Sequence, residues 1–130
     1  MFRFYEHGLH AAAEERAELE QDLRDAIKRG ELQLNYQPIV YAASETIVGF
    51  EAQMRWNHPR RGPLSPSRFV PIAEDAGLID RLGQWALQTA CADMARWPDN
   101  LRCSVNVSAL QFANPDLPTI VASALAHNGI

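Results

Sequence analysis

Two stretches of alternating side chains, separated by a short turn, constrain the fold of this chain more than any other part of its sequence. Residues 32–40 (LQLNYQPIV) alternate apolar and polar side chains, and residues 47–56 (IVGFEAQMRW) do so again after a short polar segment. A period of two is typical of β-strands whose faces have different surroundings. We therefore predict two strands in close succession, with Pro38 marking the end of the first strand or an unpaired edge.

Helical patterns and one more alternating stretch surround this pair of strands. Residues 101–107 (LRCSVNV) alternate and predict a third strand, whereas residues 57–66 contain three prolines and a glycine and predict an irregular loop that includes His58. Helix formers, candidate caps and stop signals predict these helices: residues 11–29, a helix starting at Pro66 and split or restarted by Pro71, a helix from a cap at Asp80 to about Trp97, and residues 114–129.

The order of these elements indicates the fold class. Strands that alternate with helices are typical of an α/β architecture, in which helices pack on a sheet. A complete eight-stranded α/β barrel takes about 250 residues, whereas this chain has 130 residues and about three predicted strands. The expected fold is therefore an α/β sheet with flanking helices that is incomplete as a barrel.

Composition and charge exclude several classes of protein. The chain is 47% apolar and 22% charged, and its net charge of -4 with scattered Lys and Arg argues against binding of DNA or RNA. We expect no membrane segment, because no apolar run approaches the roughly 18 residues that a span needs. The start also lacks a basic region followed by an apolar core, so the expected location is cytoplasmic. Cys91 and Cys103 lack metal-ligand spacing and are expected to be buried free thiols.

The second predicted strand has two faces of different chemistry. One carries only apolar residues, whereas the other carries Glu51, Gln53 and Arg55 in succession. Burying these polar groups without partners would be costly, so the face either has a function or is exposed to solvent. Glu51 and Arg55 would lie roughly 13 Å apart, which suits two parts of one ligand. The pattern alone favours the exposed interpretation, because antiparallel sheets commonly leave one face in water.

The third predicted strand adds Asn106 on its polar side. Asn106 lies at the carboxyl end of the strand, where α/β folds place their ligand sites. An amide oxygen together with the Glu51 carboxylate suits a hard cation such as Mg²⁺ or Mn²⁺. The alternative is that Asn106 is a turn or cap residue leading into Ser108, and the bare sequence favours this alternative.

Four blocks of the sequence resemble, in order, the EAL family, whose members hydrolyse cyclic di-GMP to linear pGpG with Mg²⁺ or Mn²⁺. They are YQPIV at residues 36–40, GFEAQMRWNHP at 49–59, SRFVPIAEDAGLI at 67–79 and SVNVS at 104–108. The resemblance covers residues 31–130 and implies the N-terminal part of an EAL domain, an incomplete TIM-like barrel whose first strand runs antiparallel to the rest. The start, FRFYEHG and a charged helix, resembles the end of a GGDEF-type domain and a connector helix, so residues 1–30 are assigned to these.

The resemblance also implies roles for individual residues. Glu51 and Asn106 match residues that bind the metal ion. Arg55 matches an arginine that contacts the phosphate of the ligand, which a guanidinium does well, and Gln37 matches a glutamine near the bound dinucleotide. In the family the metal ions polarise the phosphodiester and activate a water molecule. The expected ligand is therefore cyclic di-GMP, and the expected cofactor is Mg²⁺ or Mn²⁺.

Two departures from the family pattern argue against catalysis by this chain alone. Gln53 replaces the leucine of the motif, and its amide must find hydrogen-bond partners, which we expect to weaken the site by tilting Glu51 or competing for it. The family's later metal-binding glutamate, paired aspartates, lysine and final glutamates would lie beyond Ile130. We therefore expect residues 1–130 to be inactive by themselves.

Two other functions stay open at this point. One is a non-catalytic module that binds a nucleotide or a partner. The other is an inert fragment that associates with itself, because open strand edges and uncovered apolar faces favour pairing. If the fragment associates with itself, we expect a homodimer, formed through the unfinished sheet or by domain swapping.

Overall fold

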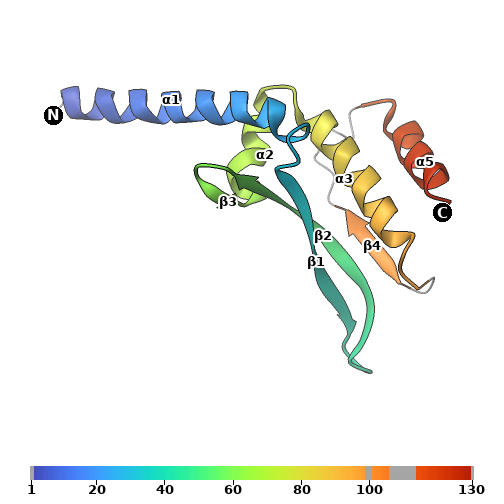
Figure 1. Ribbon diagram of the computed structural model, residues 1–130. Helices are drawn as coiled ribbons and strands as arrows, with labels where there is room; N and C mark the ends of the chain where they lie inside the picture. The colour runs from blue at the N-terminus through green and yellow to red at the C-terminus, as the bar shows by residue number, and fades with distance from the viewer. Residues whose placement is uncertain (1, 99–100, 106–113, 130) are drawn as a thin grey trace.

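The computed structural model describes residues 2–98, 101–105 and 114–129, with side chains described from residue 11 onward. It combines helices with an open sheet, as the sequence predicts (Figure 1). The elements in chain order are α1 (Phe2–Ala26), β1 (Leu32–Tyr41), β2 (Thr46–His58), β3 (Gly62–Leu64), α2 (Pro66–Asp75), α3 (Ile79–Met94), β4 (Arg102–Val105) and α5 (Leu117–His127).

Strand β2 is the centre of the sheet and pairs with each of the other strands in the described part of the chain. Along one edge it pairs antiparallel with β1, from Leu32 opposite Trp56 to Tyr41 opposite Thr46. Along its other edge, residues 49–52 pair parallel with β4, and residues 56–58 pair antiparallel with β3. Strands β4 and β3 therefore pair with different parts of the same edge, and neither pairs with residues 53–55 of β2.

Gly49 allows β4 to approach β2 closely. A methyl group at Gly49 would lie 2.4 Å from the backbone carbonyl oxygen of Arg102, which is far inside van der Waals contact. Because the obstacle is backbone, it cannot rotate away as a side chain could. Glycine is therefore the residue that the β2–β4 pairing requires here.

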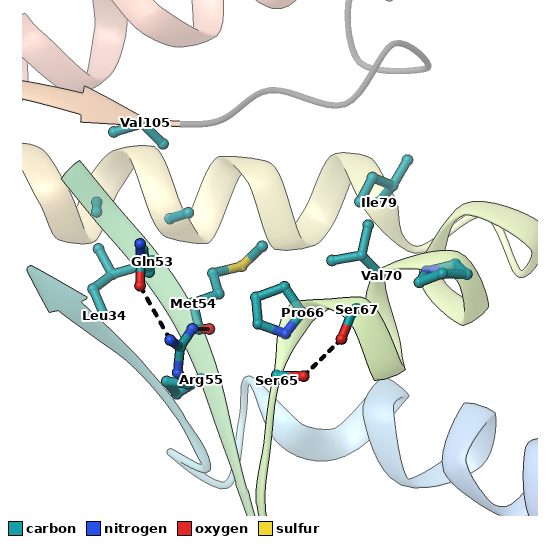
Figure 2. A pocket seen from close by; sticks show the side chains of 13 residues that line it. Leu34, Gln53, Met54, Arg55, Ser65, Pro66, Ser67, Val70, Ile79 and Val105 are labelled. Atoms are coloured by element: carbon teal, nitrogen blue, oxygen red, sulfur yellow. Dashed lines mark hydrogen bonds between the residues drawn. The ribbon is translucent and has the colours of Figure 1, made fainter. Parts of the chain in front are cut away.

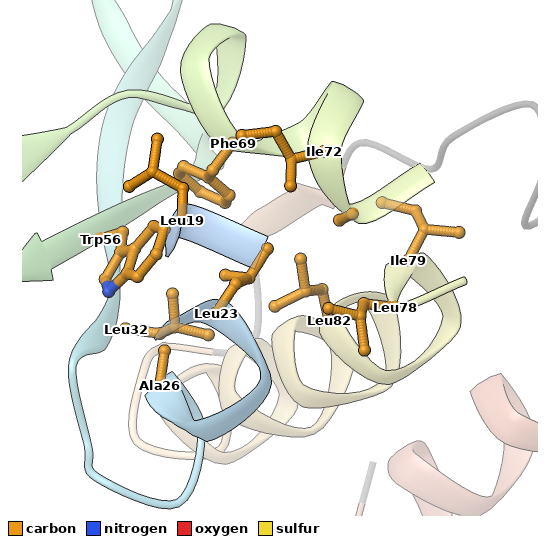
Figure 3. Packing of buried hydrophobic residues seen from close by; sticks show 11 residues of the cluster. Leu19, Leu23, Ala26, Leu32, Trp56, Phe69, Ile72, Leu78, Ile79 and Leu82 are labelled. Carbon is orange, nitrogen blue, oxygen red and sulfur yellow. The ribbon is translucent and has the colours of Figure 1, made fainter. Parts of the chain in front are cut away.

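The main hydrophobic core lies where α1, α2 and the start of α3 meet the end of β2 (Figure 3). Trp56 is fully buried there and packs edge-on against Phe69, with ring centroids 5.9 Å apart. The other buried members of the cluster are Leu19, Leu23, Ala26, Leu32, Ile72, Ala73, Leu78, Ile79 and Leu82. Each large apolar side chain contributes about 1.5–3 kcal/mol when fully buried, so this cluster fixes the end of β2 against three helices.

A second apolar contact joins α3 to the same face of the sheet. Trp97, just after α3, packs against Tyr36 of β1 and Phe50 of β2, with ring centroids 5.0 Å and 5.1 Å away. The Tyr36 hydroxyl donates a hydrogen bond to the Asp93 carboxylate of α3. Helix α3 therefore covers the apolar face and leaves the opposite, polar face uncovered by it.

Several local predictions need correction. The proline-rich segment is not simply a loop, because β2 runs on to His58 and turns back through the short strand β3. Pro71 lies inside the continuous helix α2, since burial of Phe69, Ile72 and Ala73 holds the helix across the missing backbone hydrogen bond.

The predicted cap of α3 also differs from the structure. The helix begins at Ile79 with Leu78 as its N-cap, so Asp80 lies in the first turn. There its negative charge interacts favourably with the helix dipole, which explains why the residue resembles a cap in the sequence. The helix ends at Met94, before the predicted end at Trp97. Among the described residues, no helix has both the length and the apolar character needed to cross a bilayer.

Candidate functional site

The polar faces of three strands meet on one side of the sheet. The register places Gln37 of β1 and Ser104 of β4 on either side of Glu51 of β2. Glu51 is half-buried, whereas Gln37 and Ser104 are exposed. The structure therefore brings a carboxylate, an amide and a hydroxyl together on one face. Glu51, Gln53 and Arg55, for which the pattern alone favours exposure, are each half-buried.

Gln53 links two of the predicted ligand-binding residues. Its Nε2 atom donates a hydrogen bond of 2.7 Å to Oε1 of Gln37, which lies diagonally across the strand pair. Its Oε1 atom accepts a hydrogen bond of 3.1 Å from Nη2 of Arg55 (Figure 2). The three side chains form one hydrogen-bonded row, which we call the Gln37–Gln53–Arg55 row.

The Arg55 guanidinium is also held by its own strand. Its Nη1 atom donates a hydrogen bond of 2.8 Å to the backbone carbonyl oxygen of Met54. A guanidinium carries five N–H donors in a planar fork, and these two bonds use two of them. Arg55 therefore has a defined orientation in which further donors can serve an anionic group.

A cavity of about 600 Å³ opens next to Arg55, at the point where β4 and β3 leave the edge of β2. Gln53 and Arg55 line it from the strand, and Ser65, Pro66 and Ser67 line it from the start of α2 (Figure 2). The rest of its lining is mostly apolar and comes from the sheet, α2 and α3. The cavity therefore connects the polar row with the space between the sheet and its helices.

The predicted metal ligands are not brought together within the described residues. No group of three or more His, Cys, Asp or Glu side chains within them is placed to hold a metal ion. Glu51 offers an oxygen ligand of the kind that Mg²⁺ and Mn²⁺ prefer. Asn106, the second predicted ligand, lies outside the described residues, directly after the paired residue Val105.

Among the described residues, the titratable groups with clearly shifted pKa values lie on the opposite, apolar face or on α3, which covers it. Burial, and then the hydrogen bond to Asp93, raise the pKa of Tyr36 well above its ordinary value. Burial likewise raises the pKa of the Cys91 and Cys103 thiols, both of which are free. The Tyr36 hydroxyl joins β1 to α3 through Asp93, and none of these groups forms part of the polar face.

Two features of the site were not predicted from the sequence. Ser104 shares the polar side of its strand with Asn106, and alternation alone could have indicated it. The diagonal bond from Gln53 to Gln37 depends on the register of β1 against β2, for which the sequence carries no local signal.

Comparison with known proteins gives this arrangement a context. A family model described as "EAL domain" matches residues 20–130. The chain belongs to the EAL domain family. This EAL chain is 41% identical over 131 residues to MucR of Pseudomonas aeruginosa, which is named as a bifunctional diguanylate cyclase/cyclic di-GMP phosphodiesterase. The match includes 98% of this chain and 19% of MucR.

A protein of Caulobacter vibrioides, named as an uncharacterized signaling protein, is 45% identical over the whole EAL chain, which spans 16% of its length. The solved MucR phosphodiesterase in complex with c-di-GMP superposes with a TM-score of 0.84 at 42% identity, covering 87% of this chain and 47% of that one. The chain is thus similar to part of an EAL domain, and the expected partial barrel is confirmed.

Proposed function

We propose that the polar face of this EAL chain binds cyclic di-GMP and forms part of a site for its metal-dependent hydrolysis to linear pGpG. The Gln37–Gln53–Arg55 row beside Glu51 carries the proposal, because it joins anion-binding donors to a carboxylate on one face. The relatives support it, since MucR is named as a cyclic di-GMP phosphodiesterase and its solved structure holds c-di-GMP.

Arg55 and Gln37 are the proposed contacts to the dinucleotide. A guanidinium can donate two parallel hydrogen bonds to a phosphate, and Arg55 is already oriented by Met54 and Gln53. Gln37 is exposed and can donate or accept a hydrogen bond toward a base or a ribose. These residues would bind the ligand and would not themselves activate a water molecule.

Glu51 and Asn106 are the proposed ligands of Mg²⁺ or Mn²⁺. Both supply oxygen atoms, and Glu51 is half-buried between β1 and β4. When bound, such an ion would polarise the phosphodiester and lower the pKa of a coordinated water molecule. Because two oxygen ligands do not complete such a site, we propose that residues 1–130 alone bind the dinucleotide without hydrolysing it.

Titration of the 130-residue chain with cyclic di-GMP tests this function, with Mg²⁺, with Mn²⁺ and with a chelator. We expect saturable binding that Arg55→Ala weakens by about tenfold to hundredfold, the usual range for losing hydrogen bonds to a charged group. Glu51→Gln should remove the effect of the metal. Gln84→Leu is the control, because Gln84 is exposed on α3 and lies outside the polar face. Absence of binding in all conditions would reject the proposal.

Self-association is the second candidate function, and the tip of the β1–β2 hairpin favours it. Five large apolar residues are exposed there: Ile39, Val40, Tyr41, Ile47 and Val48. A second copy that covered this tip would bury apolar surface that the described residues leave in water. If the chain self-associates, light scattering coupled to size-exclusion chromatography should detect a dimer. A monomer at all concentrations would exclude self-association.

We also propose a cytoplasmic location for the protein and a connector role for its N-terminal helix. The free thiols of Cys91 and Cys103 support a cytoplasmic protein, since disulfides are rare there. Residues 1–30 as the end of a GGDEF-type domain with a connector helix remain a proposal. The match to the EAL family begins at residue 20, inside α1.

A further inference from the structure

Gln53 uses both ends of its amide to join residues on two different strands. The donor end bonds Gln37 of β1 at 2.7 Å, and the acceptor end bonds Arg55 two residues along β2 at 3.1 Å. The described side chains include no buried polar atom without a hydrogen-bond partner. The need of this amide for partners, which the sequence suggested would disturb Glu51, is therefore met along the polar face.

We propose that Gln53 is a positioning residue, which holds Gln37 and Arg55 as one preorganised unit for an anionic phosphodiester ligand. The inference rests on the proposed function, because it takes those two residues as the contacts to cyclic di-GMP. An arginine side chain loses much rotamer freedom when it is fixed by a ligand. If Gln53 has already fixed it, less of that freedom is lost on binding, and affinity rises accordingly.

The chemistry of an uncharged amide suits this role. Its oxygen accepts a hydrogen bond from the guanidinium without neutralising the positive charge that attracts phosphate. A carboxylate at the same position would hold Arg55 more strongly and would add a negative charge beside the ligand. A leucine would remove the hydrogen bond to Gln37 and leave Arg55 with only its bond to the Met54 carbonyl. Residue 53 thus offers three substituents with three distinct expected outcomes.

The first experiment needs no ligand. Hydrogen exchange of the Arg55 guanidinium, followed by NMR with Arg55→Lys to assign its signals, reports how firmly the group is held. We expect exchange to be about fivefold faster in Gln53→Leu, the effect of losing one ordinary hydrogen bond. Gln84→Leu, the same change at an exposed position of α3, should leave it unaltered, because Gln84 lies on a helix and not on the sheet that carries Arg55. Equal exchange in the native chain and Gln53→Leu would overturn the positioning role.

The second experiment measures cyclic di-GMP affinity of the same variants. We expect Gln53→Leu to raise the Kd about fivefold. Gln53→Glu should keep Arg55 protected from exchange and still raise the Kd, because its charge repels phosphate. Tighter binding by Gln53→Leu would overturn the inference and favour the weakening that the sequence suggested. If no form binds the dinucleotide while Gln53→Leu still frees Arg55, the proposed function fails and the positioning of Arg55 stands.

Discussion

Nε2 of His58 lies 2.7 Å from Oδ2 of Asp22, and this contact joins the end of β2 to the C-terminal part of α1. The Nδ1 atom of His58 accepts hydrogen bonds of 3.1 Å from the backbone N–H groups of both Arg60 and Arg61. Because Nδ1 is an acceptor, Nε2 carries the hydrogen and donates it to Asp22. His58 therefore ties a helix, a strand and the β2–β3 turn together.

Replacing His58 should destabilise the fold markedly. The imidazole side chain has no exposed surface. His58→Ala would leave a cavity and two turn N–H groups without their acceptor, and the Asp22 carboxylate would keep only its contact with Arg60. We expect the free energy of unfolding to fall by about 3 kcal/mol, measured by urea denaturation. Asp22→Asn keeps an acceptor oxygen for His58 and should have a smaller effect. Equal losses for the two variants would contradict this account.

Apolar packing, more than ion pairing, should hold α1 on the rest of the chain. Leu23 is buried in the core, whereas Arg61 forms partly exposed ion pairs with Glu18 and Glu15 on α1, at 3.0 Å and 3.5 Å. Leu23→Ala should lower the free energy of unfolding by about 2–5 kcal/mol. Arg61→Ala should lower it by less than about 1 kcal/mol. A larger effect of Arg61→Ala in urea denaturation would show that the ion pairs dominate.

Gly49 should be the most sensitive glycine in the sheet. In Gly49→Ala the new methyl group meets the carbonyl of Arg102, and we expect a loss of about 3 kcal/mol as β4 is pushed away. Amide hydrogen exchange of β4 should rise with it. Gly62→Ala is the control, because its methyl group meets no atom within 4 Å and only its positive φ of 74° opposes the change. That strain costs about 1 kcal/mol. A loss in Gly49→Ala no greater than in Gly62→Ala would refute the close approach.

Tyr36 should make the stability of the chain sensitive to alkaline pH. Its pKa in the folded state is raised above the ordinary 10.0 by burial and by Asp93. The stabilisation from this shift is therefore complete below pH 10 and is lost as the pH rises above that value, where the unfolded chain ionises first. Tyr36→Phe should flatten the fall in unfolding free energy between pH 9 and pH 11.5, measured with urea.

The exposed Tyr41 provides the control for this titration. Tyr41→Phe, at the tip of the hairpin, should keep the alkaline pH dependence of the native chain. The same flattening in both variants would show that burial of Tyr36 is not its cause. At neutral pH, Tyr36→Phe should also lower the free energy of unfolding by about 1 kcal/mol, because it removes the hydrogen bond to Asp93.

Local patterns in the sequence were sufficient for the two long strands and their faces. The alternation in residues 32–40 and 47–56 predicted β1 and β2 within two residues of their observed bounds. It also placed Glu51, Gln53 and Arg55 on one side. Of the two alternatives predicted for Pro38, the end of the strand is wrong, because β1 continues to Tyr41; among the described strands β1 pairs with β2 alone, as an edge position requires. These features follow from a period of two that neighbouring residues set by themselves.

Features that join distant segments were not accessible in the same way. His58 reads as a loop residue because prolines and a glycine surround it, yet its partner Asp22 lies 36 positions away. Strand β3 has three residues, too few for alternation to reveal. Pro71 indicates a helix break locally, but packing of α2 on the core outweighs the missing hydrogen bond.

The sequence by itself determined the two-faced strands, the approximate helices and the blocks that resemble the EAL family. Tertiary structure decided which polar residues share a hydrogen bond, because the diagonal contact from Gln53 to Gln37 exists only in one register of β1 on β2. It also decided that Gly49 must be glycine, since Arg102 approaches it from a strand more than fifty residues later. Periodicity is a local property of the backbone, whereas register and close approach arise from packing between segments that the chain order leaves far apart.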